Sequence, residues 1–382
     1  MQSKLPNVGT TIFTVMSKLA ADVGALNLSQ GFPSFATDPT LIELVTQAMR
    51  DGHNQYAPMP GVPVLREAIA QKTSSLYGAS YHPDQEITIT SGATEALFAA
   101  ITAVVHPGDE VIVFEPAYDS YVPAIELAGG HPIYVSLAPP DYRIDWAQVR
   151  SLVTPRTRLV VVNTPHNPTG RVWTSEDIDQ LAVLAEAHNL LVVADEVYEH
   201  ILFDGRTHHS LASHPVLRER TFVIGSFGKT FHITGWKIGY CMAPPMLTVE
   251  FRKVHQFLTF SVSTPMQHAL ATYLTQPERY RTLFAFYEQK RDLFLSALAG
   301  SRFRFTPTEG TFFQNVSYAG LTDEPDHELA VRLTRDIGVA SIPVSVFYQQ
   351  RTDYQVLRFC FAKDDAMLLE AGKRLNDWSL HV

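Results

Sequence analysis

The sequence predicts an α/β fold in which a mostly parallel sheet carries helices on both faces, followed by a smaller α+β domain. Short β-branched runs recur at 86–90, 110–114, 158–163, 190–195 and 221–225. Several of these runs are apolar on both faces, as strands covered by helices on each side must be. Helix-like segments lie between the runs, and strands that alternate with helices indicate a parallel sheet.

The helix-like segments of this first part of the chain cover 94–105, 120–129 and 175–189. The third has the clearest start. Thr174 or Ser175 is a suitable N-cap residue, and acidic residues occupy the first turn. We therefore expect a helix that begins at this point.

After residue 275 the pattern changes to a long helical stretch, "ERYRTLFAFYEQKRDLFLSALAG", and then to short strand-like runs, "TFFQNV" and "VLRFCFA". Long helices followed by short strands indicate a separate α+β unit. We expect a large domain over 41–275, a small C-terminal domain over 276–382, and an N-terminal segment, 1–40, that packs with the small domain.

The charge and cysteine content exclude several classes of protein. The 382 residues carry 39 acidic and 30 basic side chains, a net charge of −9, without a dense Lys/Arg run, so neither nucleic acid nor an anionic membrane is an expected partner. Cys241 and Cys360 have no C-x-x-C spacing, which disfavours a disulfide framework and a structural zinc site. His208 and His209 are expected on a surface loop, and we expect no metal.

The N-terminal stretch "MQSKLPNVGTTIF" lacks the uninterrupted apolar core of a signal peptide. No run of about 18 apolar residues, the length that crosses a bilayer, occurs anywhere in the sequence. A cytoplasmic location without a membrane partner is therefore expected.

Polar residues follow the predicted strands at the points where the strands end. In open α/β sheets, ligands bind beyond the carboxyl ends of the strands. The residues delivered to this edge are Ser91, Gly92, Ala93, Thr94, Tyr118, Asn167, Asp195, Tyr198, Ser226 and Lys229. Their convergence predicts one ligand site at this edge of the sheet.

One interpretation of the stretch "GSFGKT" (225–230) is the phosphate-binding loop of a nucleotide triphosphatase, with "LLVVADE" (190–196) as its magnesium-binding strand. That loop, G-x-x-x-x-G-K-[ST], requires a glycine five residues before Gly228, where this chain has Val223. The acidic strand usually follows the loop, whereas here it precedes the loop. The triphosphatase interpretation also leaves the asparagine and tyrosines at the strand ends unexplained.

A pyridoxal 5′-phosphate site explains these residues together. Lys229 supplies the amine for a Schiff base, and Asp195 supplies the carboxylate that keeps the pyridine nitrogen protonated. Asn167 and Tyr198 are placed to hydrogen-bond the phenolic oxygen of the cofactor, and Tyr118 to stack on its ring. The sequence therefore predicts a pyridoxal-phosphate enzyme.

The stretch "SGAT" (91–94) follows the first predicted strand and opens a helix. Backbone N–H groups at the start of a helix are free, and they lie at the positive end of the helix dipole. Gly92, Ala93 and Thr94 are therefore the predicted binding residues for the cofactor phosphate.

Longer stretches carry a resemblance to a known family: "NLSQGFPSF", "NQYAPMPGVPVLREAI", "SGATEAL", "EPAYDSY", "NTPHNPTG", "DEVYEH", "SFGKTFHITGWKIGY" and "LRFCFAK". Over essentially its whole length, the sequence resembles the class I pyridoxal-phosphate-dependent aminotransferases of fold type I. Within this family it is most similar to the bacterial methionine aminotransferases, which are close to kynurenine aminotransferase/cysteine-conjugate β-lyase. The resemblance implies a seven-stranded sheet in the cofactor-binding domain. It also implies transfer of the amino group of methionine, aromatic amino acids or histidine to a 2-oxo acid.

The resemblance further implies a homodimer with shared active sites. Tyr56 would reach the cofactor phosphate of the neighbouring subunit, and Phe260 and Ser261 would join the neighbour's side-chain pocket. The contacts implied within one subunit are Ser226 and Lys237 to the phosphate, Arg358, Asn167 and the Gly31 backbone to the substrate α-carboxylate, and Phe13 to the substrate side chain. Lys237, in "GWKIG", departs from the arginine of many members, because it keeps the charge but lacks the bidentate fork.

Two alternatives remain on the same fold. An enzyme for β-elimination or decarboxylation would use the same lysine and acid, and its products would appear without an amino acceptor. A non-catalytic regulator is disfavoured by the presence of Lys229 and Arg358 and by the absence of a DNA-binding extension.

Overall fold

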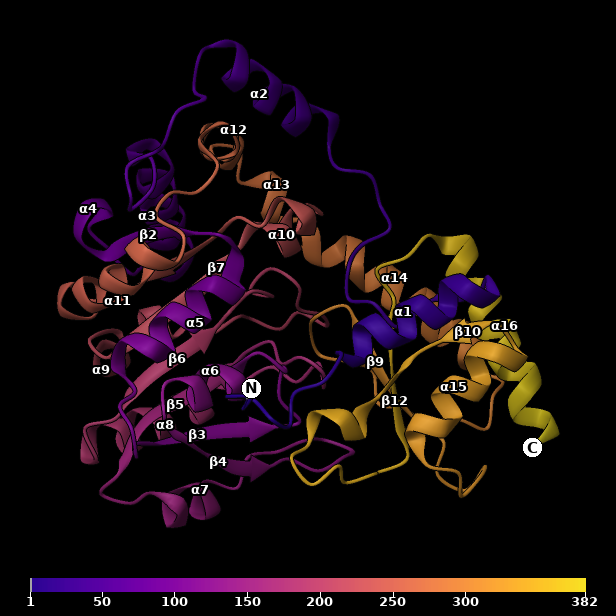
Figure 1. Cartoon of the computed structure of the whole chain (residues 1–382). Helices are drawn as coiled ribbons and strands as arrows, with labels where there is room; N and C mark the ends of the chain where they lie inside the picture. Colours follow the sequence, from indigo (N-terminus) through magenta and orange to yellow (C-terminus); the bar gives the residue numbers. More distant parts are fainter. Residues whose placement is uncertain (1) are drawn as a thin grey trace.

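The computed structural model describes residues 2–382, so that Met1, the first residue of the expected N-terminal segment, lies outside the described residues. Its largest element is a seven-stranded sheet with the strand order β2-β8-β7-β6-β5-β3-β4 (Figure 1). The strands are β2 (Ile87–Thr90), β3 (Glu110–Glu115), β4 (His131–Ser136), β5 (Thr157–Asn163), β6 (Leu191–Asp195), β7 (Thr221–Ser226) and β8 (Gly239–Met242). Only β8 runs antiparallel to its neighbours. The predicted mostly parallel α/β sheet is confirmed.

All five predicted strands are present, and the sheet gains two that the sequence pattern did not reveal. β4 lies at one edge and is mostly half-buried or exposed, so it lacks the continuous apolar run of a covered strand. β8 is only four residues long. A strand of this length is too short to show a period.

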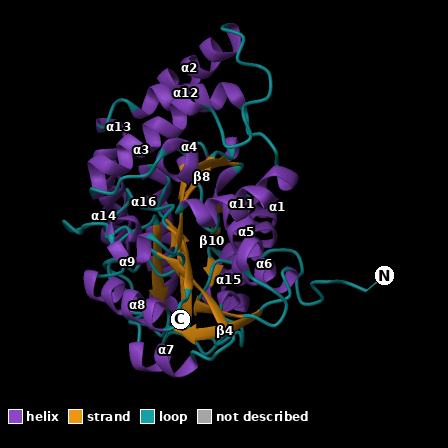
Figure 2. Ribbon diagram, turned by 90° about the vertical axis from the view of Figure 1, so that its left-hand side faces the viewer, coloured by secondary structure: helices purple, strands orange, loops and turns teal. Residues whose placement is uncertain are grey.

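Successive residues of β5 point to opposite faces of the sheet, and each face has its own core. Leu159 and Val161 pack in one cluster with α5 (Gly92–Val104), α6 (Tyr121–Leu127) and α11 (Pro245–Leu258). Val160 and Val162 pack in another with α3 (Pro63–Tyr77), α7 (Trp146–Leu152) and α8 (Ser175–Ala187). Figure 2 shows these helices on the two sides of the strands. Both faces are therefore covered, as a buried parallel sheet requires.

Helix α8 begins where the sequence indicated. Thr174 is its N-cap: the Thr174 side chain accepts a hydrogen bond from the Asp177 backbone N–H, and the Asp177 side chain accepts one from the Thr174 backbone N–H. This reciprocal pair satisfies two N–H groups that the helix itself leaves without partners. The remaining α-helices of the large sheet region are α2 (Pro39–Arg50), α4 (Pro83–Glu86), α9 (Pro215–Arg218), α10 (Phe227–Thr230), α12 (Thr264–Leu274) and α13 (Glu278–Arg281).

A second, smaller sheet has the order β11-β12-β9 and is antiparallel. Its strands are β9 (Phe313–Ser317), β11 (Ile342–Pro343) and β12 (Val356–Cys360), and the helices with it are α14 (Leu283–Leu298), α15 (Asp326–Asp336) and α16 (Asp365–His381). Helix α1 (Ile12–Val23) and strand β1 (Leu26–Asn27) lie beside these elements, because β1 pairs in parallel with β10 (Val339–Ala340) (Figure 1). None of the helices described in residues 2–382 is long and apolar enough to cross a membrane.

Candidate active site

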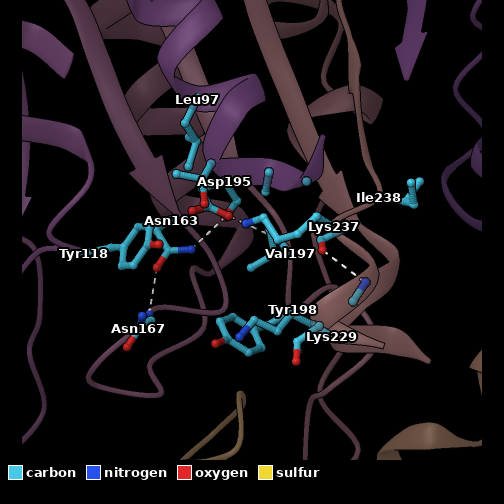
Figure 3. A pocket seen from close by; sticks show the side chains of 16 residues that line it. Leu97, Tyr118, Asn163, Asn167, Asp195, Val197, Tyr198, Lys229, Lys237 and Ile238 are labelled. Carbon is cyan, nitrogen blue, oxygen red and sulfur yellow. Dashed lines mark hydrogen bonds between the residues drawn. The ribbon is translucent and has the colours of Figure 1, made fainter. Parts of the chain in front are cut away.

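A cavity of about 160 Å³ lies at the carboxyl edge of the large sheet. Ten residues expected at the cofactor line it: Gly92, Ala93, Thr94, Tyr118, Asn167, Asp195, Tyr198, Ser226, Lys229 and Lys237. Figure 3 shows the labelled members of this set grouped around one space. The parallel direction of the strands brings these residues together, although almost 150 positions separate the first from the last.

Asp195 is the last residue of β6, and its side chain is buried. The Tyr121 hydroxyl donates to Asp195 Oδ2 at 2.8 Å, and the Val197 N–H donates to Oδ1 at 3.3 Å. Burial raises the pKa of Asp195 to about 6, against the lowering effect of the Tyr121 hydrogen bond. Both hydrogen-bond partners are uncharged, and the Lys229 charge lowers this pKa by less than either hydrogen bond does, so within the described residues the carboxylate has no positively charged hydrogen-bond partner. A protonated ring nitrogen would supply that charge.

Lys229 lies in the short helix α10, directly after β7. Its Nζ donates to the Gly31 carbonyl oxygen at 2.9 Å and lies over the rings of Tyr198 and Phe312. Burial lowers the pKa of Lys229 to about 8. At pH 7 roughly a tenth of an amine with this pKa is neutral. A neutral amine is the form that attacks a carbonyl carbon or accepts a proton.

The first turn of α5 forms an anion-binding cradle with Lys237. Gly92 has φ +75°, and a Cβ atom added to Gly92 would lie 3.2 Å from Lys237 Nζ, so the ammonium group stands close to the helix N-terminus. Ser226 Oγ lines the same cavity and accepts from the Gly228 N–H at 3.2 Å. Helix N–H groups, a hydroxyl and an ammonium group together suit a phosphate dianion. The residues present thus fit pyridoxal 5′-phosphate.

The guanidinium group of Arg358, on β12, is buried without a carboxylate partner in the described chain. Nη1 donates to Asn167 Oδ1 at 2.7 Å, Nη2 donates to the Ser29 carbonyl oxygen at 3.3 Å, and Nε has no partner. Burial lowers the pKa of Arg358 to about 10, so the group still carries its charge at neutral pH. A buried cation that still has unpaired hydrogen-bond donors is suited to bind the carboxylate of a substrate.

Phe13 lies beside this arginine and Gly31 lies beside Phe313, and neither of the two lines the cavity itself. The Phe13 ring centre lies 5.3 Å from the Arg358 guanidinium carbon, and the Phe313 ring centre lies 3.9 Å from it. A Cβ atom on Gly31 would lie 2.6 Å from Phe313 Cζ, so that glycine is required for the close approach. Asn167 lines the cavity and also contacts Arg358, and it thereby links the two parts of the site.

Tyr56, Phe260 and Ser261 lie together at a different place on the chain. Tyr56 is 83% exposed, and its ring centre is 5.5 Å from that of Phe260. Ser261 Oγ donates to the Ala57 carbonyl oxygen at 3.1 Å. None of the three lines the cavity of its own subunit. Their expected contribution to a neighbouring subunit stays a prediction.

Several residues of the site were not found from the sequence. Asn163 Nδ2 donates to the Asp195 carbonyl oxygen, and Asn163 Oδ1 accepts from the Asn167 N–H (Figure 3). Asn163 ends a predicted strand, and Tyr121 begins α6 shortly after Tyr118, so the sequence positions of both residues pointed to the site. The contact between Phe313 and Arg358 has no local sequence signal, because it depends on the pairing of β9 with β12.

The expectation that His208 lies on the surface was wrong. His208 is 8% exposed, and its Nε2 lies 2.9 Å from Glu196 Oε2. The acidic partner, which follows Asp195 on the chain, draws the ring inward and makes its burial possible. His209 is exposed, as expected.

The fold and the site define a pyridoxal-phosphate enzyme of fold type I. Residues 23–375 match the family model of aminotransferases of class I and II. The chain belongs to this family, and its cofactor is pyridoxal 5′-phosphate. The triphosphatase interpretation is therefore excluded, and transamination is the activity of the family.

Curated relatives and solved structures cover nearly all of the chain. Methionine aminotransferase of Escherichia coli is 52% identical, over 98% of this chain and 97% of that protein. A crystal structure of an Escherichia coli protein identified as having methionine aminotransferase function superimposes with a TM-score of 0.97 over 99% of both chains. Human kynurenine–oxoglutarate transaminase 1 is 33% identical, over 96% of this chain and 95% of that protein. Aspartate aminotransferase of Thermus thermophilus with maleate is 31% identical, with a TM-score of 0.90 over 99% of this chain and all of that chain.

Proposed function

We propose that this enzyme transfers the amino group of methionine, and more slowly that of aromatic amino acids or histidine, to a 2-oxo acid. The observation that carries the proposal is the environment of Arg358. Within residues 2–382 its buried guanidinium forms no ion pair with a carboxylate, its Nε has no hydrogen-bond partner, and it lies against the rings of Phe13, Phe313 and Phe347. Such a site binds an α-carboxylate beside an apolar side chain. The 52% identity to the Escherichia coli methionine aminotransferase supports methionine as the donor.

We assign the contacts with the cofactor and the substrate as follows. Gly92, Ala93, Thr94, Ser226 and Lys237 bind the phosphate, Asp195 the ring nitrogen, Asn167 and Tyr198 the phenolic oxygen, and Tyr118 the ring face; Arg358, Asn167 and Gly31 bind the α-carboxylate, and Phe13 the substrate side chain. Lys237 provides one ammonium group where many relatives have a guanidinium, so the helix N–H groups carry a larger share of the phosphate contacts.

Lys229 is the base of the proposed reaction. When bound, pyridoxal 5′-phosphate supplies a carbonyl carbon that joins to amines and a ring that accepts the electron pair left by the Cα proton. Lys229 Nζ would hold the cofactor covalently, and once the amino group of the substrate had taken its place it would, as a free amine, move the proton that leaves Cα. Its pKa of about 8 favours both tasks near neutral pH.

Asp195 and Arg358 stabilise charges on two different molecules, the cofactor and the substrate. The Asp195 carboxylate holds a proton at the ring nitrogen, and this proton makes the ring a stronger acceptor of electrons. Arg358 and Asn167 fix the α-carboxylate and so orient the Cα–H bond toward Lys229. Burial of both groups strengthens these interactions by excluding water.

We expect methionine to exceed aspartate in kcat/KM by at least about tenfold, which corresponds to roughly 1.4 kcal/mol of discrimination in the transition state. Besides Lys229, the only lysine or arginine that lines the cavity within the described residues is Lys237. Lys237 faces the helix N-terminus assigned to the phosphate. The charge of an aspartate side chain would thus be buried without a partner, whereas the methionine thioether packs well against aromatic rings.

The measurement compares the two donors with one 2-oxo acid acceptor on the purified enzyme, with kynurenine, phenylalanine and histidine alongside. A preference for aspartate would contradict the assignment of the pocket. Products of β-elimination that appear without an acceptor would favour the cysteine-conjugate lyase alternative over transamination.

The proposal includes a homodimer in which each subunit completes the other's site. Tyr56 is almost fully exposed in the single chain and lies beside Phe260, which is half-exposed. Phe257, on the same segment, is 87% exposed. An exposed group of large aromatic side chains is typical of an interface, and it supports the expectation that Tyr56, Phe260 and Ser261 act in the neighbouring site.

Mixing two inactive variants, Tyr56→Ala and Lys229→Ala, should restore activity. Each heterodimer would contain one site with both the native lysine and the native tyrosine, so about half of the sites in the heterodimers would be complete. The measurement is transaminase activity after the two proteins are unfolded together and refolded, with each variant refolded alone as the control. A monomer that is fully active at low concentration would contradict shared sites.

The division of the chain into a segment over 1–40, a large domain over 41–275 and a small domain over 276–382 is also part of the proposal. The pairing of β1 with β10 and the shared core of Met16 and Leu28 with α14–α16 support the placement of the N-terminal segment with the small domain. The cytoplasmic location stays a prediction.

A further inference from the structure

The side chains of the stretch 195–199 alternate between two environments. Asp195 and Tyr198 line the cofactor cavity. Glu196 and Glu199 are equally buried but contact groups outside it: Glu196 accepts from the Leu211 N–H and lies 2.9 Å from His208, and Glu199 meets Lys72. The mechanism uses only the first two residues, so the role of the two buried glutamates is open.

Lys72 comes from α3 and forms a buried ion pair with Glu199. Lys72 Nζ lies 2.5 Å from Glu199 Oε1, and their side chains are only 3% and 7% exposed. Burial alone would raise the pKa of Glu199, but the Lys72 charge and the hydrogen bonds hold this pKa well below its usual range. The pair is therefore ionised. His200 Nε2 lies 3.3 Å from the same ammonium group, and burial lowers the pKa of His200 to about 3, so the ring is neutral.

Two tyrosines complete the network. The Tyr77 hydroxyl donates to Glu199 Oε2 at 2.5 Å, and the Tyr240 hydroxyl donates to Oε1 at 2.8 Å. Tyr240 also accepts from Lys72 Nζ at 2.9 Å. Each oxygen of the carboxylate therefore has a donor, which is the condition under which a buried charge is tolerated.

Tyr240 connects this network to the strand that carries Lys229. It lies on β8 opposite Gly225 of β7, and a Cβ atom on Gly225 would lie 2.2 Å from Tyr240 Cζ. Gly225 directly precedes Ser226, and Lys229 follows within one turn. The network thus touches two of the segments that deliver side chains to the cofactor, one through Glu199 beside Tyr198 and the other through Tyr240 against Gly225.

A buried ion pair seldom adds net stability relative to apolar residues of the same volume, so stability alone does not account for this one. The ion pair and its hydrogen bonds fix the relative positions of the segments that they join. Such positioning matters, because a displacement of about 1 Å in an active site can cost about 10²-fold in rate. We propose that Lys72, Glu199 and Tyr240 are positioning residues of the aminotransferase site, which hold Tyr198 and Lys229 in register with each other. This inference rests on the proposed function.

The decisive variants are Tyr240→Phe, which removes one hydroxyl and keeps the ring against Gly225, and the neutral pair Lys72→Met/Glu199→Gln. The pair removes both charges and keeps one acceptor oxygen, and one of the two tyrosine hydroxyls can instead accept from the new amide NH2 group. We expect both proteins to fold and to bind the cofactor. In both, kcat should fall by about tenfold or more while KM for the amino donor changes by less than about twofold, because the binding contacts of Arg358 remain. The absorption maximum of the bound cofactor should shift, and its Kd should rise.

Glu110→Gln is the matched control. Glu110 is a buried acid paired with Arg156, but it begins β3 and so lies at the amino edge of the sheet, away from the cavity. This variant should change thermal stability alone. The proposed function is tested separately, by the donor comparison on the parent enzyme. The cofactor spectrum and the cofactor Kd of the variants do not depend on which amino donor the enzyme prefers.

If Tyr240→Phe and the neutral pair keep the parent's kcat and cofactor spectrum and lose only thermal stability, the network is structural and the proposal is overturned. It is also overturned if Glu110→Gln lowers kcat and shifts the spectrum to the same extent. Should the neutral pair fail to fold, the nearly isosteric Tyr240→Phe variant decides alone.

Discussion

Replacing Lys229 with alanine should abolish transamination, with a loss in kcat of at least about 10⁴-fold, because one change removes both the covalent attachment of the cofactor and the base at Cα. The lysine is half-buried in the cavity and has its pKa lowered to about 8, so another lysine at the surface would not replace it. The visible absorption of the covalently held cofactor should disappear, although the phosphate cradle around Gly92 and Lys237 should still bind the cofactor noncovalently.

The measurements are the absorption spectrum after addition of cofactor and the rate with methionine and a 2-oxo acid. Lys373→Ala, at an exposed position of α16, is the control, and it should leave both the spectrum and the rate unchanged. Normal transamination by the Lys229→Ala protein would show that this lysine is not the base.

Local sequence pattern was sufficient for the parts of the fold that are covered on both sides. A strand such as β5 is apolar on both faces where helices pack on each side, so its central run of leucine and valines identifies it without further information. The exposed edge strand β4 and the short β8 do not meet that condition. Their place in the sheet is decided by pairing with distant strands, and no local period records it.

The same distinction applies to the site. Asp195, Asn167 and Lys229 were predicted together because each follows a parallel strand, and parallel strands end at one edge. Phe313 was not predicted, because its position against Arg358 depends on an antiparallel register between β9 and β12. His208 was placed wrongly, since its burial depends on Glu196, twelve residues earlier, and a turn brings the two together.

Asp195→Asn should lower kcat by several powers of ten while leaving the fold intact. The variant keeps one side-chain oxygen that can accept from the Val197 N–H, and its NH2 group can donate to the Tyr121 hydroxyl oxygen, but it carries no charge. Without the carboxylate the ring nitrogen loses its proton, and the ring becomes a weaker electron acceptor. Turnover of methionine at neutral pH is the measurement, and near-parent activity would show that Asp195 has only a structural role.

The same substitution should have the opposite effect on the stability of the cofactor-free protein. Burial raises the pKa of Asp195 from its ordinary 3.8 to about 6 in the folded chain. A carboxyl group with a higher pKa in the folded state binds more protons there, so its contribution to stability is present below pH 3.8 and lost as the pH rises through about 6. At pH 7 the parent therefore carries a buried charge that the variant lacks.

Without cofactor, the Asp195→Asn protein should be more stable than the parent at pH 7, by on the order of 3 kcal/mol, and the difference should shrink toward zero as the pH falls to about 4. Urea unfolding of both cofactor-free proteins across this range measures it, and Glu110→Gln serves as the control acid, since the pKa of Glu110 is lowered rather than raised. Saturation with cofactor should reduce or reverse the difference, because the protonated ring nitrogen then supplies the missing positive charge. A stability difference that does not change with pH would contradict this account of the carboxylate.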